Sequence, residues 1–144
     1  MDTPTYGGCL TSEDIRMFIF DRNIGDNDLL MDLNFSEVEI QNAMVRAARE
    51  YASIPPYTST VNPGCLPSHT NMFLDATAAQ LYISEMSKLM RNDIDYNSGN
   101  VTTNLVAKRI AHLKELYKLH TDRFTEAAKS WKLTENINNG FFNY

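Results

Sequence analysis

The chain has 144 residues, with 43% hydrophobic residues, 22% charged residues and a formal net charge of −5. This length and composition are typical of one globular domain, which needs no metal and no network of disulfides to bury a core. No run approaches the roughly 18 apolar residues of a membrane span, and the acidic balance argues against a general nucleic-acid binder, which usually carries a basic face.

Charge is unevenly distributed along the chain. Residues 1–50 carry ten acidic and four basic side chains, a net charge of −6, whereas residues 101–135 carry seven basic and four acidic side chains, a net charge of +3. Opposite charges at the two ends of a chain can attract within one molecule or between copies arranged head to tail. We therefore expect the acidic half of one copy to lie against the basic last helix of the next copy or of a neighbouring protein.

The first predicted helix spans residues 11–21. Thr11 is a good N-cap residue, and Asp14 stands at the capping-box position three residues later. Asn23 or Gly25 can take the left-handed conformation that ends a helix, and an acidic loop follows.

The second predicted helix, over residues 36–52, has the clearest signals in the sequence. Ser36 is its N-cap, Glu39 completes a capping box, and Pro55-Pro56 ends the helix because proline lacks the backbone donor. Its apolar residues follow the spacing of a single helical face: Ile40, Ala43, Met44, Ala47, Ala48 and Tyr51.

Residues 54–70 contain four of the five prolines, together with serines, threonines and one glycine. This composition favours turns over a helix. Two alternatives remain here: a long ordered loop, or a short extended hairpin with an edge strand near residues 57–61.

Two longer helices are predicted over residues 71–91 and 101–134. The second of these carries apolar residues in strict 4-3 alternation from Val106 to Trp131. More than thirty residues make a rod of about 50 Å, whereas a compact domain of this length has a radius of gyration of only about 15 Å. Part of the apolar stripe therefore has to be covered by another copy or another protein.

The sequence thus predicts an all-α bundle of about four helices with a long last helix. The core is expected to contain the residues that recur on the apolar faces: Phe35, Ile40, Met44, Ala47, Tyr51, Ile83, Met86, Ile110, Leu113 and Tyr117.

No pattern in the sequence indicates catalysis, a cofactor or a metal site. His120 lies on the apolar stripe, where a core or interface histidine is the expected interpretation, and its spacing from His112 does not match a helical metal site. Cys9 and Cys65 are far apart and lack a CxxC spacing, so free thiols are favoured over one disulfide. We therefore expect a protein that binds other proteins and has no enzymatic activity.

The last nine residues, 136–144, contain no charged side chain but three aromatic ones. Asparagine and glycine are poor helix formers, so the last helix is expected to end near Leu133. This divides the chain into a helical domain, 1–135, and an extended C-terminal arm, 136–144.

The order of these elements resembles that of the head-to-tail connector proteins (adaptor or head-completion proteins) of tailed bacteriophages. The resemblance covers nearly the whole chain, and its most family-like segment is DLNFSEVEIQNAMVRAAREYASIPP, which ends at Pro56. It implies a structural protein of the virion that forms a ring, commonly of twelve copies, between portal and tail. It also implies a location at the head-tail junction, with assembly in the host cytoplasm.

The same resemblance implies the partners and the binding residues. The arm would dock into the portal protein, other tail or connector proteins would lie below the ring, and DNA would pass through the channel without sequence-specific binding; no membrane is involved. The arm residues expected to bind the portal are Ile137, Phe141, Phe142 and Tyr144. The residues expected at the interface between subunits are Lys114, Lys118, Arg123 and Trp131. The competing interpretation is a small helical subunit or regulator of a cellular complex, with DNA association left open.

Overall fold

The computed structural model describes residues 9–21, 35–56, 63–65, 69–92 and 102–141, and within these ranges it contains helices and no strand. The helices are α1 (Ser12–Ile19), α2 (Glu37–Ser53), α3 (Thr70–Asn92) and α4 (Thr102–Phe141), with a short 3-10 turn, η2 (Pro63–Cys65). The all-α prediction is confirmed. The predicted alternative of an edge strand near residues 57–61 lies outside the described residues.

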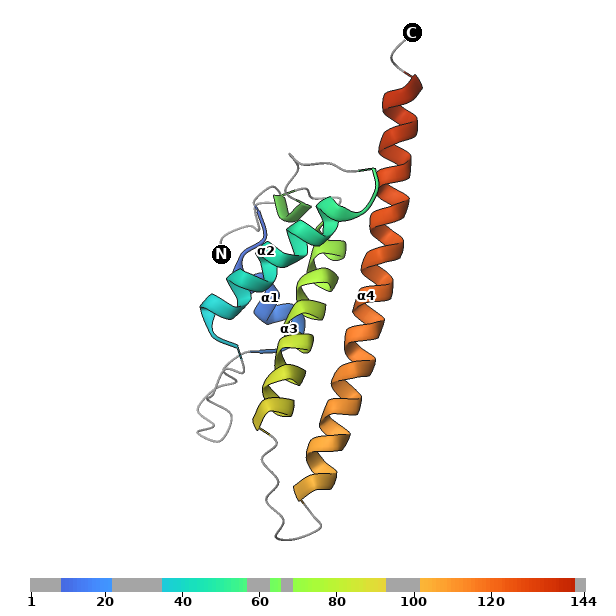
Figure 1. Cartoon of the computed structure of the whole chain (residues 1–144). Helices are drawn as coiled ribbons and strands as arrows, with labels where there is room; N and C mark the ends of the chain where they lie inside the picture. Colours follow the sequence, from blue (N-terminus) through green and yellow to red (C-terminus); the bar gives the residue numbers. More distant parts are fainter. Residues whose placement is uncertain (1–8, 22–34, 57–62, 66–68, 93–101, 142–144) are drawn as a thin grey trace.

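The helices are arranged around α3 (Figure 1). α4 runs antiparallel to α3 along one side, while α1 and α2 cover the other side of α3. α4 is the longest element, and its C-terminal end projects past the other helices.

Both predicted capping boxes are present. The Thr11 N–H donates to Asp14 Oδ2 at 2.8 Å, and the Ser36 N–H donates to Glu39 Oε2 at 2.8 Å. These bonds satisfy donors that the first turn of a helix otherwise leaves unpaired, so the starts of α1 and α2 are fixed by local sequence.

A buried polar network joins the end of α1 to the start of α2. Arg16 Nη1 donates to Asp21 Oδ2 and to the Phe35 carbonyl, both at 2.9 Å, and the Phe35 N–H donates to Asp21 at 3.2 Å. α1 ends earlier than predicted, and Phe20 takes the left-handed conformation, with φ 58°, that was expected of Asn23 or Gly25. The carboxylate of Asp21 must turn inward to reach Arg16, which places the reversal at Phe20.

The core has two buried clusters. One contains Ala47, Tyr51, Met72, Phe73, Ala76, Phe124 and Ala128. The other contains Ile15, Phe35, Ile40, Ala43 and Leu81. Met44 is partly buried against both, which joins them into one core.

Most of the predicted core is confirmed. Six of the ten residues are buried: Phe35, Ile40, Ala47, Tyr51, Met86 and Leu113. Three are half-buried: Met44, Ile110 and Tyr117. The prediction that Ile83 is buried is wrong, because 37% of its surface is exposed. Leu81 and Met86, on either side of Ile83 in α3, are buried, so the exposure belongs to the face of the helix that Ile83 occupies.

The predicted end of the last helix is also wrong. α4 continues past Leu133 to Phe141, so residues 136–141 are helical rather than an extended arm, and residues 142–144 lie outside the described part. Asparagine and glycine are poor helix formers, by about 1 kcal/mol or less each. Nucleation is the costly step in forming a helix, and a helix that is already formed can be extended without repeating it. α4 can therefore continue through a few residues of low helix propensity.

Cys9 and Cys65 form a disulfide, which corrects the expectation of free thiols. The Leu10 N–H donates to the Gly64 carbonyl at 2.8 Å, so the segment before α1 lies beside η2 and brings the two sulfurs together. Spacing along the sequence carried no sign of this contact, because the two residues are separated by 56 positions.

Ile40→Ala is expected to lower the free energy of unfolding by about 2–5 kcal/mol, because the side chain is fully buried and its removal leaves a cavity. Ile83→Ala is the matched control, since this isoleucine is 37% exposed, and its loss is expected to stay under about 1.5 kcal/mol. Urea unfolding measures both. Equal losses would contradict the described packing of α2.

A double substitution, Cys9→Ser with Cys65→Ser, is expected to lower the free energy of unfolding by about 2–4 kcal/mol, because the disulfide closes a long loop in the unfolded chain. Thiol titration in denaturant provides the check on the bond itself. Wild-type protein is expected to show no titratable thiol before reduction and two after it.

Candidate functional site

Two side-chain pairs define how far α3 covers α4. His120 Nδ1 lies 2.6 Å from Asp75 Oδ1, and Arg109 Nη2 donates to Glu85 Oε1 at 3.1 Å. This antiparallel register places the start of α3, at Thr70, opposite the stretch of α4 near Thr125. Residues 126–141, about 24 Å of helix at 1.5 Å per residue, therefore extend beyond the start of α3.

The first part of this extension is anchored to the end of α2 by Lys132. Its ammonium group donates to the carbonyls of Tyr51 and Ile54 and lies 4.4 Å from the centre of the Tyr51 ring. Carbonyls at the end of a helix lack partners within the helix, and a cation there is favoured by the helix dipole. Lys132 is 1% exposed. Burial lowers the pKa of Lys132, whereas the Glu135 carboxylate acts to raise it.

His69, just before α3, packs beside the same anchor. Its ring lies against the rings of Tyr51, at 5.8 Å between centres, and Trp131, at 4.8 Å. His69 Nε2 lies 3.7 Å from Glu135 Oε1. Burial lowers the pKa of His69 from its ordinary value, and the neighbouring carboxylate of Glu135 partly opposes this.

Beyond Glu135 the backbone of α4 continues as a helix to Phe141. Leu133, two residues before Glu135, is 62% exposed. Ile137 and Phe141 follow Leu133 at successive intervals of four, so the backbone places all three residues on one face of the helix. We call residues 133–141 the α4 end. This segment combines a helical backbone that extends past the start of α3 with a face of apolar residues, of which Leu133 is exposed.

An Asp–His pair lies deeper in the bundle. Asp75 and His120 are both largely buried, and the rings of Phe18 and Tyr82 lie 5.7 and 5.5 Å from the imidazole. A carboxylate of this kind can orient an imidazole as a base. Here the aromatic rings come from α1 and α3, so the pair joins three helices, and His120 lies in the core as its position on the stripe predicted.

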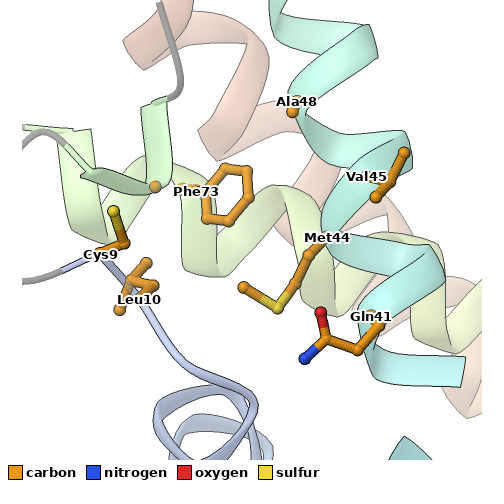
Figure 2. A pocket seen from close by; sticks show the side chains of 8 residues that line it. Cys9, Leu10, Gln41, Met44, Val45, Ala48 and Phe73 are labelled. Atoms are coloured by element: carbon orange, nitrogen blue, oxygen red, sulfur yellow. The ribbon is translucent and has the colours of Figure 1, made fainter. Parts of the chain in front are cut away.

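A small apolar pocket opens on the side formed by α2, α3 and the segment before α1 (Figure 2). Its volume is about 190 Å³. The side chains around it come from residues that are far apart in sequence: Cys9, Leu10, Gln41, Met44, Val45, Ala48, Gly64 and Phe73. Gln41 and Val45 are exposed, so the pocket is accessible from outside.

The structure separates the residues predicted at the subunit interface. Lys114 and Lys118 are exposed and one turn apart, whereas Arg123 is about 140° further round the helix from Lys118. Trp131 packs on His69 with 37% of its surface exposed. These four residues therefore do not form one patch. The contact expected between the acidic half of one copy and α4 of the next copy or of a neighbouring protein stays a prediction; within the described part of one chain, the Lys and Arg ion pairs join α1 to α2, α2 to α3 and α3 to α4.

The structure places two of the four predicted portal-binding residues, and their binding stays a prediction. Ile137 and Phe141 belong to α4, whereas Phe142 and Tyr144 lie outside the described residues. Lys132, His69 and Asp75 were missed by sequence reasoning. The one sequence signal for a buried cation on α4 was the position of Lys132, directly after Trp131, which lies on the apolar stripe.

Comparison of the chain with known protein families, curated proteins and solved structures found no match. Among the described residues, no cluster of histidine, cysteine and carboxylate side chains has the geometry to hold a metal ion. Within the same ranges, no helix is both long and apolar enough to span a membrane.

The stability of the protein is expected to fall between pH 7 and pH 5.5, and His69→Gln is expected to reduce this dependence. Because the pKa of His69 is lowered in the folded state, the unfolded chain takes up a proton first as the pH falls below 6.5. Burial of the imidazole lowers the His69 pKa, and the Glu135 carboxylate partly opposes this shift.

Thermal unfolding at the two pH values measures this effect, and His112→Gln on the exposed face of α4 is the control. An unchanged pH dependence in His69→Gln would show that the imidazole is not held in its neutral form.

Proposed function

We propose that this chain is a non-enzymatic assembly protein of the head-to-tail connector class, and that the α4 end docks into a neighbouring protein of the portal type. The observation that carries the proposal is the unequal length of the two central helices. α4 has 40 residues, about 60 Å, and α3 has 23, about 35 Å.

The position of the α4 end supports docking. Lys132 and His69 hold the base of the extension against the bundle, so the residues beyond project in a fixed direction (Figure 1). A preformed helix loses less conformational entropy on binding than an extended arm, which loses about 1–2 kcal/mol per ordered residue. An apolar helical face that enters a groove is an established mode of recognition.

The composition of the α4 end supports an apolar partner surface. Residues 136–144 carry no charge, and Leu133, Ile137 and Phe141 share one face. Burying each such side chain contributes roughly 1.5–3 kcal/mol. An acceptor groove of apolar character in the portal-type partner fits this face.

The disulfide and the charge distribution also support a place in a virion. Disulfides persist in secreted proteins and at the surfaces of virions and cells, and they are rare in the cytosol. The net charge of −6 over residues 1–50 and +3 over residues 101–135 suits contacts between successive copies in a ring. DNA would pass through the channel of that ring without being bound by sequence.

The second candidate function is a small helical subunit or regulator of a cellular complex. The uncovered α4 end supports it too, since a single partner can cover the apolar face. The two functions differ in assembly. A regulator is expected to be a stable dimer or tetramer on its own, whereas a connector is expected to form large rings at high concentration or on a portal.

Deleting residues 136–144 is expected to leave the melting temperature nearly unchanged and to abolish docking on a portal ring, because α4 has already passed the start of α3 at Glu135. Negative-stain images of the protein mixed with the portal of its own virion provide the measurement. Leu133→Glu is expected to weaken docking in the same way, since this side chain is 62% exposed.

The matched control is Leu119→Glu, on the outer face of the same helix and 45% exposed, which is expected to dock normally. Normal docking of the truncated chain would move the binding surface away from the α4 end. Early melting of the truncated chain would mean that these residues belong to its own core.

A further inference from the structure

The two ends of the Cys9–Cys65 disulfide are held very differently. Cys65 ends η2, and the two preceding residues of this turn, Pro63 and Gly64, are buried where η2 packs against α2 and α3. Cys9 is exposed, and it stands two residues before the N-cap of α1 at Thr11. Breaking the bond therefore leaves the η2 side in place and frees the Cys9 side.

The position of α1 is secured by contacts of its own. Its first turn is closed by the capping box of Thr11 and Asp14, and Ile15 is fully buried in the core. The buried polar network holds the other end of this helix. Because these contacts begin at Thr11, the stretch that the disulfide keeps in place is short and consists of Cys9 and Leu10.

Leu10 has two further contacts that would remain after reduction. Its N–H donates to the Gly64 carbonyl at 2.8 Å, and its side chain is partly buried against the core cluster around Tyr51. A hydrogen bond that is exchanged for one to water contributes little net stability. Without the covalent bond, these contacts have to offset the backbone freedom that an unanchored stretch of chain gains.

The stretch that the disulfide holds forms one side of the apolar pocket. Figure 2 shows Cys9 and Leu10 on one side of this pocket, with Met44 and Val45 of α2 on the other. When residues 9 and 10 leave, the side chains of Met44 and Phe73 lose this cover and meet water. The disulfide therefore controls how much apolar surface α2 and α3 expose.

The exposure of Cys9 gives a small thiol access to the bond. Thiol–disulfide exchange begins with the attack of a thiolate on a disulfide sulfur, so its rate depends on access. Disulfides that are exposed in the folded protein are typically the labile and regulatory ones, whereas structural disulfides resist reduction. The folded chain thus carries a bond of the accessible kind, placed at the edge of a pocket.

We propose that the Cys9–Cys65 disulfide is a redox switch, which closes the pocket beside α2 when it is oxidised and releases residues 9 and 10 when it is reduced. In reduction, a glutathione thiolate attacks Sγ of Cys9, and the Cys65 thiolate leaves and takes up a proton. A second glutathione thiolate attacks the glutathione sulfur of the mixed disulfide, and Cys9 leaves in the same way. Two glutathione molecules become one glutathione disulfide, and the same steps in reverse close the switch.

The biological direction of the switch rests on the proposed function. A connector chain is made in the host cytoplasm, where thiols are kept reduced, and it ends in a virion, at whose surface disulfides persist. The chain is therefore expected to enter assembly with residues 9 and 10 released. Oxidation outside the cell then closes the pocket after the particle has been built.

Reduction of the oxidised protein by glutathione, followed by alkylation and mass spectrometry, tests whether the bond is reached in the folded state. The reduction rate is expected to stay constant as urea is raised to just below the unfolding transition, because the bond is accessible without unfolding. A rate that rises steeply with urea over this range would show that thiols reach the bond only in the unfolded chain. The bond would then be a permanent one, and the inference would be overturned.

Amide hydrogen exchange, followed by NMR, tests the release of the stretch. The Leu10 amide is expected to exchange at least about tenfold faster after reduction, and the Cys9→Ser, Cys65→Ser variant is expected to show this fast exchange without reductant. The Asp21 and Ile40 amides, which are hydrogen-bonded at other helix ends, are the controls and are expected to be unchanged. An unchanged Leu10 amide overturns the inference, and so does equal acceleration of all three amides, which indicates a general loss of stability.

Methionine methyl groups labelled with carbon-13 provide a measurement of the pocket itself. The Met44 signal is expected to shift on reduction, because this side chain lines the pocket. Met90, which lies near the end of α3 and is 62% exposed, is the control and is expected to keep its signal. A Met44 signal that does not respond to reduction would show that the pocket stays closed, against the inference.

Trapping of thiols with N-ethylmaleimide tests the direction of the switch in its natural setting. Chains from cells that are producing the virion are expected to carry two labels, one on each cysteine, and chains from released virions none. A disulfide already formed inside these cells overturns the direction. If the α4 end fails to dock while glutathione opens the pocket as described, the portal partner is wrong and the switch stands. If docking succeeds while reduction requires unfolding, the switch is wrong and the assembly function survives.

Discussion

The antiparallel packing of α3 against α4 is the constraint from which the other features follow. Its register is fixed by the Asp75–His120 pair toward the start of α3 and by Glu85 with Arg109 in the second half of α3. Once this register is set, the difference in length between the two helices must appear at the C-terminal end of α4. The opposite side of α3 is then free for α2 and α1, whose buried faces complete the core.

Buried charges in this structure hold elements in position. Lys132 connects α4 to the last turn of α2, and the Arg16–Asp21 pair connects the end of α1 to the start of α2. Removing charges from water is expensive, and such pairs contribute less to stability than their distances suggest. Both groups use main-chain partners, so each one determines where a helix end lies. The α4 end and Phe20 are the two surface features that depend on these positions.

The sequence predicted the parts of the fold that depend on local signals. Capping boxes at Thr11 and Ser36 located two helix starts, and periodic apolar residues predicted α2, α3 and most of the core. Features that depend on contacts between distant residues were not predicted. The Cys9–Cys65 bond, the partner of Lys132 and the pocket around Met44 each join segments far apart in the chain. The end of α4 was misjudged because residue propensities are small beside the cooperativity of a formed helix.

The disulfide has a mechanical consequence. It joins two residues that are separated by 56 positions, with α1 and α2 between them. Without the bond, that stretch of chain would extend to about 180 Å under tension at roughly 3.3 Å per residue. With the bond in place, a pulling force that enters at Cys9 passes through the sulfur atoms to η2 and on to α3. Neither α1 nor α2 then lies in the covalent path of the load, and the pocket and Phe20 are shielded from stretching along the chain.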